Sequence, residues 1–397
     1  MFKVLFFPRD RVKIYLSFGF VSLTWLLCLF QNDNVQIEMY SSDQKKTILV
    51  ATEFYSNPFP RVIGVCPVEC NYHFDDERDN LTLVANADAV LFHFTWQDMI
   101  PVMKLLRHRK RGQYSNTYYQ FPNNNIWAFL TAESYDSTLI SSRFTSYQAF
   151  DGLFNWSISF RRDSTLWTPY AGFIGFGSIH EKFKANSYRL QRFEPPDASK
   201  IATKRRHIAA VISNCHDTYG RLAVLEQLKS FGLTVDVYGA CSPNNLKCPG
   251  RMSSECYEML EEKYYFYASF ENSLCKDYFT EKFLNVFNYD MVPVTINAAF
   301  IDQPDKNMPA FIDSKDFTSL KELANYLLEV VSNADRYHSY FEWRKNYGLL
   351  YDDSTTPLCL LCQAVQDDQI KKQTPLRNFT HWLSDQSGCH KELFPSL

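Results

Sequence analysis

Short apolar runs separated by polar loops and helical repeats predict the ordered elements in the first half of this chain. Three of these runs have the length and apolar content of buried strands: Thr47 to Thr52, Ala87 to Phe94 and Ile126 to Thr131. A stretch with helical character, Met99 to Arg107, lies between the last two. Strands that alternate with helices in this way indicate a parallel α/β sheet.

The same alternation starts again in the second half. Ile208 to Ile212 is predicted to be a strand, a helix with leucines at positions 222, 225 and 228 follows, and Leu233 to Tyr238 is the next strand. Ser319 to Ser332 has apolar residues at helical spacing and is predicted to pack on this sheet.

Tyr264 to Ile296 is predicted to form a complete βαβ unit in about thirty residues. Its strands are the aromatic run Tyr264 to Phe270 and the β-branched run Met291 to Ile296. Helical spacing of Phe279, Phe283, Val286 and Phe287 predicts a helix that begins near Asp277 to Thr280. The unpaired N–H groups at its start, with Lys282 in the first turn, predict an anion site.

The N-terminal region contains a mostly apolar, uncharged segment, Ile14 to Phe30. Basic residues precede it and acidic residues follow it, which predicts a cytosolic N-terminus. A cleaved signal peptide is the alternative, because a membrane span usually needs about 20 residues. No small-x-small cleavage site follows Leu29, so an uncleaved anchor is favoured.

These patterns divide the chain into six segments, with the main boundary at the proline-rich stretch that begins at Glu194. We expect a cytosolic tail at 1–13, a transmembrane signal anchor at 14–30 and a polar stem at 31–46. Two α/β domains follow at 47–195 and 196–350, and a cysteine-containing segment at 351–397 ends the chain.

Composition agrees with a two-domain globular protein, because 46% of the 397 residues are hydrophobic and 21% are charged. The net charge of −3 argues against a nucleic-acid partner. The basic runs Arg107 to Arg111 and Lys204 to His207 are therefore interpreted as solvated faces.

Eleven cysteines suggest an oxidising compartment for the part beyond the anchor. Cys28 lies in the anchor, and the other ten are disulfide candidates whose connectivity stays open. They are Cys66, Cys70, Cys215, Cys241, Cys248, Cys256, Cys275, Cys359, Cys362 and Cys389. Zinc at Cys359 and Cys362 is a weaker alternative, because no matching second pair is present. Asn80, Asn155 and Asn378 begin glycosylation sequons.

Polar residues at the carboxyl ends of the predicted strands are candidates for chemistry, because open α/β sheets bind ligands there. In the first half this residue is Glu133, and in the second half Asn214 and Tyr238 occupy such positions. Arg221 lies in the first turn of a helix, where its charge opposes the helix dipole unless an anion binds nearby.

Three longer motifs resemble those of the α1,3-fucosyltransferases of glycosyltransferase family 10. The string FENS-x-x-x-DYFTEK, followed by VPV, resembles the donor-binding motif of these GDP-fucose enzymes. AES-x-x-S around Glu133 resembles the acceptor-side motif that supplies the catalytic base, and FNWSISFRRDS from Phe154 to Ser164 resembles a second signature. Two departures are Thr165, where an acid is common, and the segment from Asn288 to Asp290 before VPV.

The resemblance implies a GT-B fold, in which two Rossmann-like domains face a cleft, and it implies roles for individual residues. Glu133 would be the catalytic base, and Lys282 and Arg221 would neutralise the departing diphosphate. On the acceptor side it adds Arg161 and Arg162, for which an architectural role through Asp163 is favoured. The expected donor-binding residues are Asn214, Arg221, Tyr238, Asn272, Tyr278, Glu281 and Lys282.

The reaction implied is inverting transfer of L-fucose from GDP-β-L-fucose to O3 of a GlcNAc in N-glycans of glycoproteins. Cysteine-bearing segments that include Tyr238-Gly-Ala-Cys241 and Leu246-Lys-Cys248 are most similar to the branch that modifies the innermost core GlcNAc. The alternatives are an outer-chain, Lewis-type acceptor, or an inactive glycan-binding relative in the lumen.

The sequence also predicts the cofactor requirement and the location. The chain contains no D-x-D sequence, which metal-dependent glycosyltransferases use to hold manganese, so we expect no cofactor and no essential metal. We expect a single-pass type II protein in the Golgi membrane, with its catalytic part in the lumen.

Overall fold

The computed structural model describes most of the chain between residues 45 and 389, together with three short N-terminal strands. The described residues are 2–7, 11–16, 35–36, 45–61, 66–112, 125–136, 147–176, 189–215, 219–250, 253–296, 307, 309–351, 356–371, 376, 378–384 and 388–389.

The first half is built on a six-stranded sheet in which every neighbouring pair is parallel. In spatial order its strands are β5 (Cys70–His73), β4 (Lys46–Val50), β6 (Ala89–His93), β7 (Ile126–Thr131), β8 (Trp156–Ser159) and β9 (Leu166–Trp167). β7 is buried along its whole length, as expected for a central parallel strand with helices on both faces. The three strands predicted for this half are confirmed as β4, β6 and β7.

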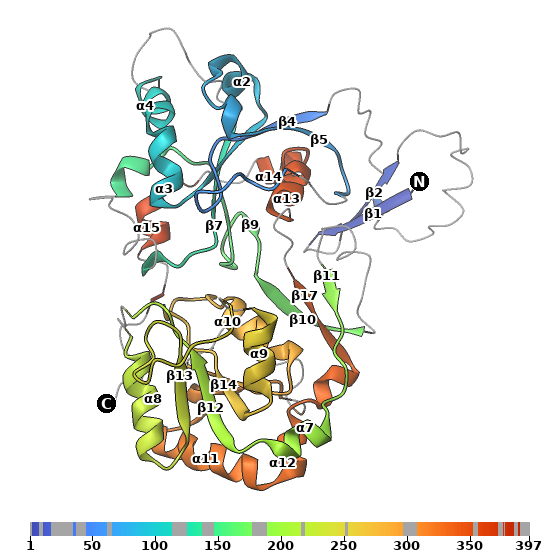
Figure 1. The fold of residues 1–397 in the computed structure, drawn as a ribbon. Helices are drawn as coiled ribbons and strands as arrows, with labels where there is room; N and C mark the ends of the chain where they lie inside the picture. Colours follow the sequence, from blue (N-terminus) through green and yellow to red (C-terminus); the bar gives the residue numbers. More distant parts are fainter. Residues whose placement is uncertain are drawn as a thin grey trace.

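Helices cover both faces of this sheet (Figure 1). One face carries α2 (Leu81–Asn86), α3 (Trp96–Met99), α4 (Met103–Gly112) and α15 (Phe379–Leu383). The other face carries α13 (Thr356–Ala364) and α14 (Asp368–Lys371). The helix predicted from Met99 to Arg107 is divided by a 3-10 turn, Ile100–Val102, because Pro101 cannot donate the backbone hydrogen bond of a continuous helix.

The second half is built on a five-stranded, fully parallel sheet. In spatial order its strands are β13 (Val235–Tyr238), β12 (Arg206–Val211), β14 (Tyr264–Ala268), β15 (Val292–Thr295) and β16 (Ile312–Asp313). Its helices are α7 (Ala198–Thr203), α8 (Arg221–Ser230), α9 (Ser254–Glu261), α10 (Glu281–Leu284), α11 (Leu320–Ser332) and α12 (Ala334–Ser339). The strands and helices predicted for this half are thus present, although the helix of the predicted βαβ unit is much shorter than expected.

A small antiparallel sheet connects the two halves (Figure 1). β17 (Tyr347–Tyr351) pairs with β10 (Ala171–Gly175) on one side and with β11 (Arg189–Gln191) on the other. After β17 the chain returns to the first half, where Leu358 and Leu361 of α13 pack against its sheet. The C-terminal segment therefore completes the core of the N-terminal half.

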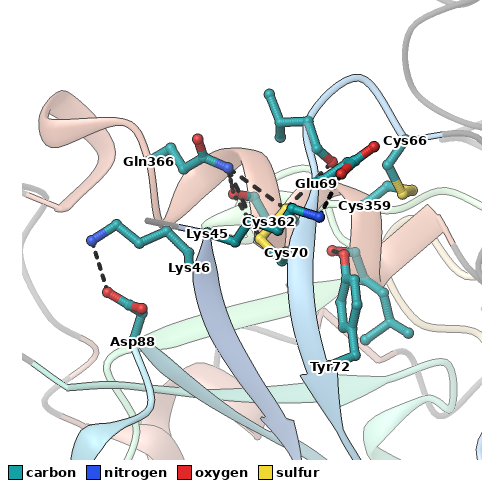
Figure 2. The surroundings of a disulfide bond; sticks show 12 residues. Lys45, Lys46, Cys66, Glu69, Cys70, Tyr72, Asp88, Cys359, Cys362 and Gln366 are labelled. Atoms are coloured by element: carbon teal, nitrogen blue, oxygen red, sulfur yellow. Dashed lines mark hydrogen bonds and ion pairs between the residues drawn. A yellow bond between two sulfur atoms is a disulfide. The ribbon is translucent and has the colours of Figure 1, made fainter. Parts of the chain in front are cut away.

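The ten predicted cysteines form five disulfides, Cys66–Cys359, Cys70–Cys362, Cys215–Cys241, Cys248–Cys256 and Cys275–Cys389. The first two join α13 to β5 and the loop before it, near the ion pairs Lys45–Glu69 and Lys46–Asp88 (Figure 2). Cross-links that close loops of nearly 300 residues restrict the unfolded chain strongly and so stabilise the returning helix. Because Cys359 and Cys362 are both oxidised, the zinc alternative at this pair is wrong.

At the N-terminus, β1 (Phe2–Phe7), β2 (Arg11–Leu16) and β3 (Val35–Gln36) form a three-stranded sheet. Residues 14–16 of the predicted anchor belong to β2, and the rest of the anchor lies outside the described residues. None of the described helices combines the length and apolarity that crossing a bilayer requires.

Candidate active site

Glu133 lies just beyond the carboxyl end of β7, where the buried strand meets solvent. The Thr131 hydroxyl fixes the backbone here, because it accepts from the Glu133 N–H and lies 3.2 Å from the Glu133 carbonyl. The Tyr170 hydroxyl donates to the carbonyl of the intervening Ala132 at 2.5 Å. Hydrogen bonds with Thr131 and Tyr170 therefore fix the backbone at the end of the strand, and this fixes the position of the Glu133 Cα.

Two phenols donate to the Glu133 carboxylate, one to each oxygen. The Tyr278 hydroxyl lies 3.1 Å from Oε2, and the Tyr55 hydroxyl lies 3.4 Å from Oε1. Burial, followed by the charge of Glu133, raises the pKa of both phenols well above the ordinary value for tyrosine. Both therefore stay protonated and act as hydrogen-bond donors at neutral pH. Tyr278 belongs to the second half, so the carboxylate is held between the two sheets.

The loop that carries Tyr278 is attached to the first half at several further points. The Ser134 hydroxyl donates to the Ser273 hydroxyl at 2.7 Å, and both residues are buried. The Arg162 N–H donates to the Asp277 carboxylate at 2.9 Å. The Cys275–Cys389 disulfide ties the same loop to the C-terminal segment. These contacts place the carboxyl ends of the two sheets next to each other.

Two hollows flank this loop, and Cys275 lines both of them. The first, of about 260 Å³, contains Glu133 together with Arg161 and Lys276. The second, of about 330 Å³, lies on the second sheet and contains Glu271 and Tyr278. A carboxylate thus faces one hollow, and the polar end of the predicted donor motif faces the other.

Lys282 and Glu271 form the charged centre on the side of the second sheet. The Lys282 ammonium lies 3.5 Å from Glu271, 3.3 Å from Glu281 and 3.1 Å from the Thr280 hydroxyl. Burial alone would lower the pKa of Lys282, but the two carboxylates outweigh it and raise this pKa above its ordinary value. Lys282 is therefore a cation at neutral pH. It is only 22% exposed, which strengthens its interaction with a bound anion.

The helix of the predicted βαβ unit begins where expected, after Thr280, but it is much shorter than its apolar spacing suggests. α10 ends at Leu284 and continues as a 3-10 turn, Asn285–Asn288. The buried Glu271 carboxylate also occupies the start of the helix, where it accepts from the Thr280 N–H at 2.7 Å. Positive charge at this position comes from Lys282 and not from a helix dipole.

Arg221 begins α8 and is buried at the carboxyl ends of two strands of the second sheet. Its guanidinium donates to the carbonyl of Asn214, after β12, at 3.0 Å and to the carbonyl of Phe270, after β14, at 3.4 Å. The cation is therefore fixed at the edge of the sheet where ligands of open α/β folds bind.

The other predicted donor-binding residues differ in how exposed their side chains are. Glu281 is half exposed beside Lys282, and Asn272 is half-buried in the loop after β14. The Tyr238 side chain is buried under α9, and its hydroxyl lies 3.0 Å from that of Tyr264. The structure thus places the Tyr238 side chain in the core and not on an open surface.

Arg161 and Arg162 contact different partners. Arg161 is buried and binds the Asp163 carboxylate through two hydrogen bonds of 2.9 and 2.6 Å. It also lies over the Trp382 ring of α15 and donates to the Trp382 carbonyl. Arg162 is half exposed and lies 3.8 Å from Asp277. These contacts favour the architectural role predicted for the pair.

The three sequon asparagines all take part in backbone hydrogen bonds. Asn80 and Asn378 are exposed, and each caps a helix, α2 and α15 respectively. Asn155 is half-buried, and its side-chain oxygen accepts from the Trp127 N–H at 2.8 Å.

One group of possible metal-binding side chains occurs among the described residues, Asp136 with Cys275 and Cys389. The two cysteines form a disulfide, so their sulfurs are not thiolate ligands.

The sequence patterns missed Tyr55 and the structural role of Glu271. Tyr55 follows the carboxyl end of β4, so the same strand-end rule that selected Glu133 would have reached it. The interaction between Glu271 and Thr280 joins residues of one loop, and no periodic signal reports it.

Comparison with known proteins identifies the family. Residues 43–171 match the model for the N-terminal part of fucosyltransferases, and residues 201–382 match that of glycosyltransferase family 10 (fucosyltransferase), C-terminal part. Alpha-(1,3)-fucosyltransferase 7 of Bos taurus is 32% identical over 294 residues, which cover 71% of this chain and 70% of that protein.

Further similarities include a second relative and a solved structure. Glycoprotein 3-alpha-L-fucosyltransferase A of Drosophila melanogaster is 32% identical over 238 residues, which cover 59% of this chain and 44% of that protein. A crystal structure of an α1,3-fucosyltransferase aligns over 86% of this chain and 96% of that one, at 16% identity and a TM-score of 0.47. On the family models and the bovine relative, the chain belongs to glycosyltransferase family 10, the fucosyltransferases.

Proposed function

We propose that this protein transfers L-fucose from GDP-β-L-fucose to O3 of a GlcNAc in glycoprotein N-glycans, with the innermost core GlcNAc as acceptor. The observation that carries the proposal is the meeting of the two halves at Glu133. A carboxylate at the end of one sheet contacts Tyr278 of the other, and four residues after Tyr278 the chain supplies the cation Lys282. A base and a charge-neutralising group are the two elements that an inverting glycosyl transfer requires.

In this reaction Glu133 takes the proton of the acceptor hydroxyl while the new bond from O3 to C1 of fucose forms. The bond between C1 and the β-phosphate oxygen breaks on the opposite side, so the β-linked donor gives an α-linked product. The fucosyl ring passes through an oxocarbenium-like transition state. Lys282 stabilises the negative charge that develops on GDP, and Arg221 does the same once diphosphate replaces the carbonyls as its partner.

Three features support a glycoprotein acceptor in the lumen of the Golgi. The Drosophila relative is named as a glycoprotein fucosyltransferase. In the cysteine-bearing segments that resemble the core-modifying branch, Cys248 pairs with Cys256, and Cys241 pairs with Cys215 outside them. Five disulfides also favour an oxidising compartment, which agrees with a type II membrane protein anchored by residues 14–30.

The acceptor is tested by incubating the purified protein with GDP-fucose and a panel of defined N-glycans. Fragment-ion mass spectrometry then locates the added deoxyhexose. We expect it on the innermost GlcNAc. Addition of fucose only to antennary GlcNAc would show that the acceptor is the outer-chain, Lewis-type GlcNAc and not the core GlcNAc. Glycan binding without transfer to any member of the panel would favour an inactive, glycan-binding relative.

Chelation of divalent metals is expected to leave transfer unchanged, because side-chain cations neutralise the diphosphate in this scheme. The initial rate is measured before and after dialysis against EDTA, and again after addition of manganese. A metal-dependent glycosyltransferase assayed in parallel shows that chelation was effective. Loss of activity with EDTA and its return with manganese would contradict the metal-independent scheme.

A further inference from the structure

The loop after β4 contains a tight turn in a backbone conformation that its residues seldom adopt. Phe54 and Asn57 exchange two backbone hydrogen bonds, of 2.8 and 3.1 Å. The two residues between them, Tyr55 and Ser56, have positive φ angles of 51° and 60°. Two left-handed residues in succession characterise a type I′ turn, which normally contains Asn and Gly. A left-handed backbone is unfavourable for residues other than glycine, so surrounding contacts must hold the turn.

The carboxylate of Asp98 supplies those contacts. Its Oδ2 accepts from the Tyr55 N–H at 3.0 Å, and its Oδ1 accepts from the Ser56 N–H at 2.8 Å. Oδ2 also accepts from the Thr95 hydroxyl at 2.8 Å and lies 2.6 Å from Nδ1 of His93. The carboxylate therefore binds both strained peptide groups at once.

Asp98 and His93 are completely buried, although neither belongs to the proposed base or donor site. Burial alone would raise the pKa of Asp98, but hydrogen bonds from His93, Thr95 and Ser56 outweigh it and keep this pKa below the ordinary value. Asp98 stays ionised at neutral pH. A buried carboxylate that binds backbone N–H groups in this way is costly unless its partners are fixed.

The turn directs the Tyr55 side chain toward Glu133. The Tyr55 ring packs against the His93 ring, with 4.5 Å between their centroids, and its hydroxyl reaches Oε1 of Glu133. Glu133 is half-buried and lines the first of the two hollows, so an acceptor hydroxyl can approach its carboxylate from there.

We propose that Tyr55 is a positioning residue for the base Glu133, and that the buried Asp98–His93 pair holds the strained turn that presents it. This inference rests on the proposed fucosyl transfer. Tyr278 orients the carboxylate from the donor half and Tyr55 orients it from the acceptor half. Each phenol holds one oxygen of the carboxylate, and each of these oxygens keeps a second lone pair that can take the proton of the acceptor.

Replacing Tyr55 by Phe removes only the hydroxyl that contacts Glu133. We expect kcat to fall about tenfold, the usual effect of losing one hydrogen bond to a charged group, while KM for GDP-fucose stays unchanged. Tyr72→Phe is the matched control, because the Tyr72 hydroxyl contacts a backbone carbonyl of α13 in the same half. A Tyr55→Phe enzyme with unchanged kcat would overturn the proposal.

A double-mutant cycle tests whether Asp98 acts through Tyr55. We expect Asp98→Asn to lower kcat by a similar factor, and Asp98→Asn combined with Tyr55→Phe to lower it no further than either alone. Effects that multiply would show that Asp98 acts independently and would overturn the link. Thr95→Val removes a single donor to Asp98 and takes the place of Asp98→Asn if that variant does not fold.

Backbone hydrogen exchange tests, without a measurement of turnover, whether Asp98 stabilises the turn at Tyr55 and Ser56. The peptide that contains Tyr55 and Ser56 should exchange faster in Asp98→Asn, or in Thr95→Val, than in the wild type, and equal rates would contradict the role of Asp98.

The proposed function and the role of Tyr55 fail in different ways. A wild-type protein that transfers no fucose overturns the proposed function and the role of Tyr55 with it. An active wild type with an equally active Tyr55→Phe variant overturns only the latter.

Discussion

Substitution of Glu133 by Gln is expected to reduce kcat for fucosyl transfer by a factor on the order of 10² to 10⁴, the usual contribution of a general base. Gln keeps the size of the side chain, and its one oxygen can still accept from one of the two phenols. Its NH2 group takes the place of the other oxygen, and the amide cannot take the acceptor proton. GDP binding, measured by calorimetry, should stay at its wild-type value because Glu133 belongs to the other sheet.

Glu226→Gln is the control for the Glu133 variant, since Glu226 is a 75% exposed carboxylate on the surface of α8. Wild-type turnover in this control shows that the loss of a carboxylate alone does not affect transfer. If a folded Glu133→Gln protein transferred fucose at the wild-type rate, another group would have to be the base.

Replacing Lys282 by Ala is expected to lower kcat/KM for GDP-fucose by a factor on the order of 10² to 10³, typical of losing one group that stabilises transition-state charge. The ammonium is held by Glu271 and Glu281 and is little exposed, so water replaces it poorly. Calorimetry should show weaker GDP binding. Unchanged binding would remove Lys282 from the diphosphate site.

Removal of Lys282 also leaves Glu271 buried without its cation, which can destabilise the loop. The double variant Glu271→Gln, Lys282→Ala separates this effect, because it removes both charges. We expect the double variant to regain thermal stability and to stay impaired in GDP binding. Lys229→Ala, at a half-exposed lysine of α8, is the control for a general loss of positive charge.

The sheets could be predicted because their strands carry a strong local signal. Ile126 to Leu130 is apolar and lies in the centre of its sheet. Glu133 was selected because it follows that strand and because its surroundings resemble the acceptor-side motif. α11 was found from helical spacing, and Ser319, the first residue of the predicted stretch, caps it. Elements whose apolar pattern is local, such as β7 and α11, could therefore be predicted from the sequence.

Contacts between the halves could not be predicted in this way. Tyr278 was assigned to the donor, yet its hydroxyl contacts Glu133, which lies 145 positions earlier in the chain. The short α10 follows from Glu271 and Thr280, whose hydrogen bonds outweigh the apolar spacing that predicted a longer helix. The turn at Tyr55 lacks the Asn and Gly that normally signal it, because Asp98 supplies the missing stabilisation from 43 positions away.

The disulfides show the same limit. The ten cysteines were candidates from the sequence, but ten cysteines allow many pairings and spacing does not choose among them. The observed pairs Cys66–Cys359 and Cys70–Cys362 depend on the return of α13 to the first sheet, a consequence of the overall topology.

In the proposed reaction, Glu133 and Lys282 carry out a single inverting displacement on GDP-β-L-fucose. The NMR spectrum of the purified product tests this, with the wild-type protein and a GlcNAc-terminated N-glycan core as acceptor. We expect one added fucose, α-linked to O3 of GlcNAc. A β-linked fucose would mean retention, and the single displacement would be wrong.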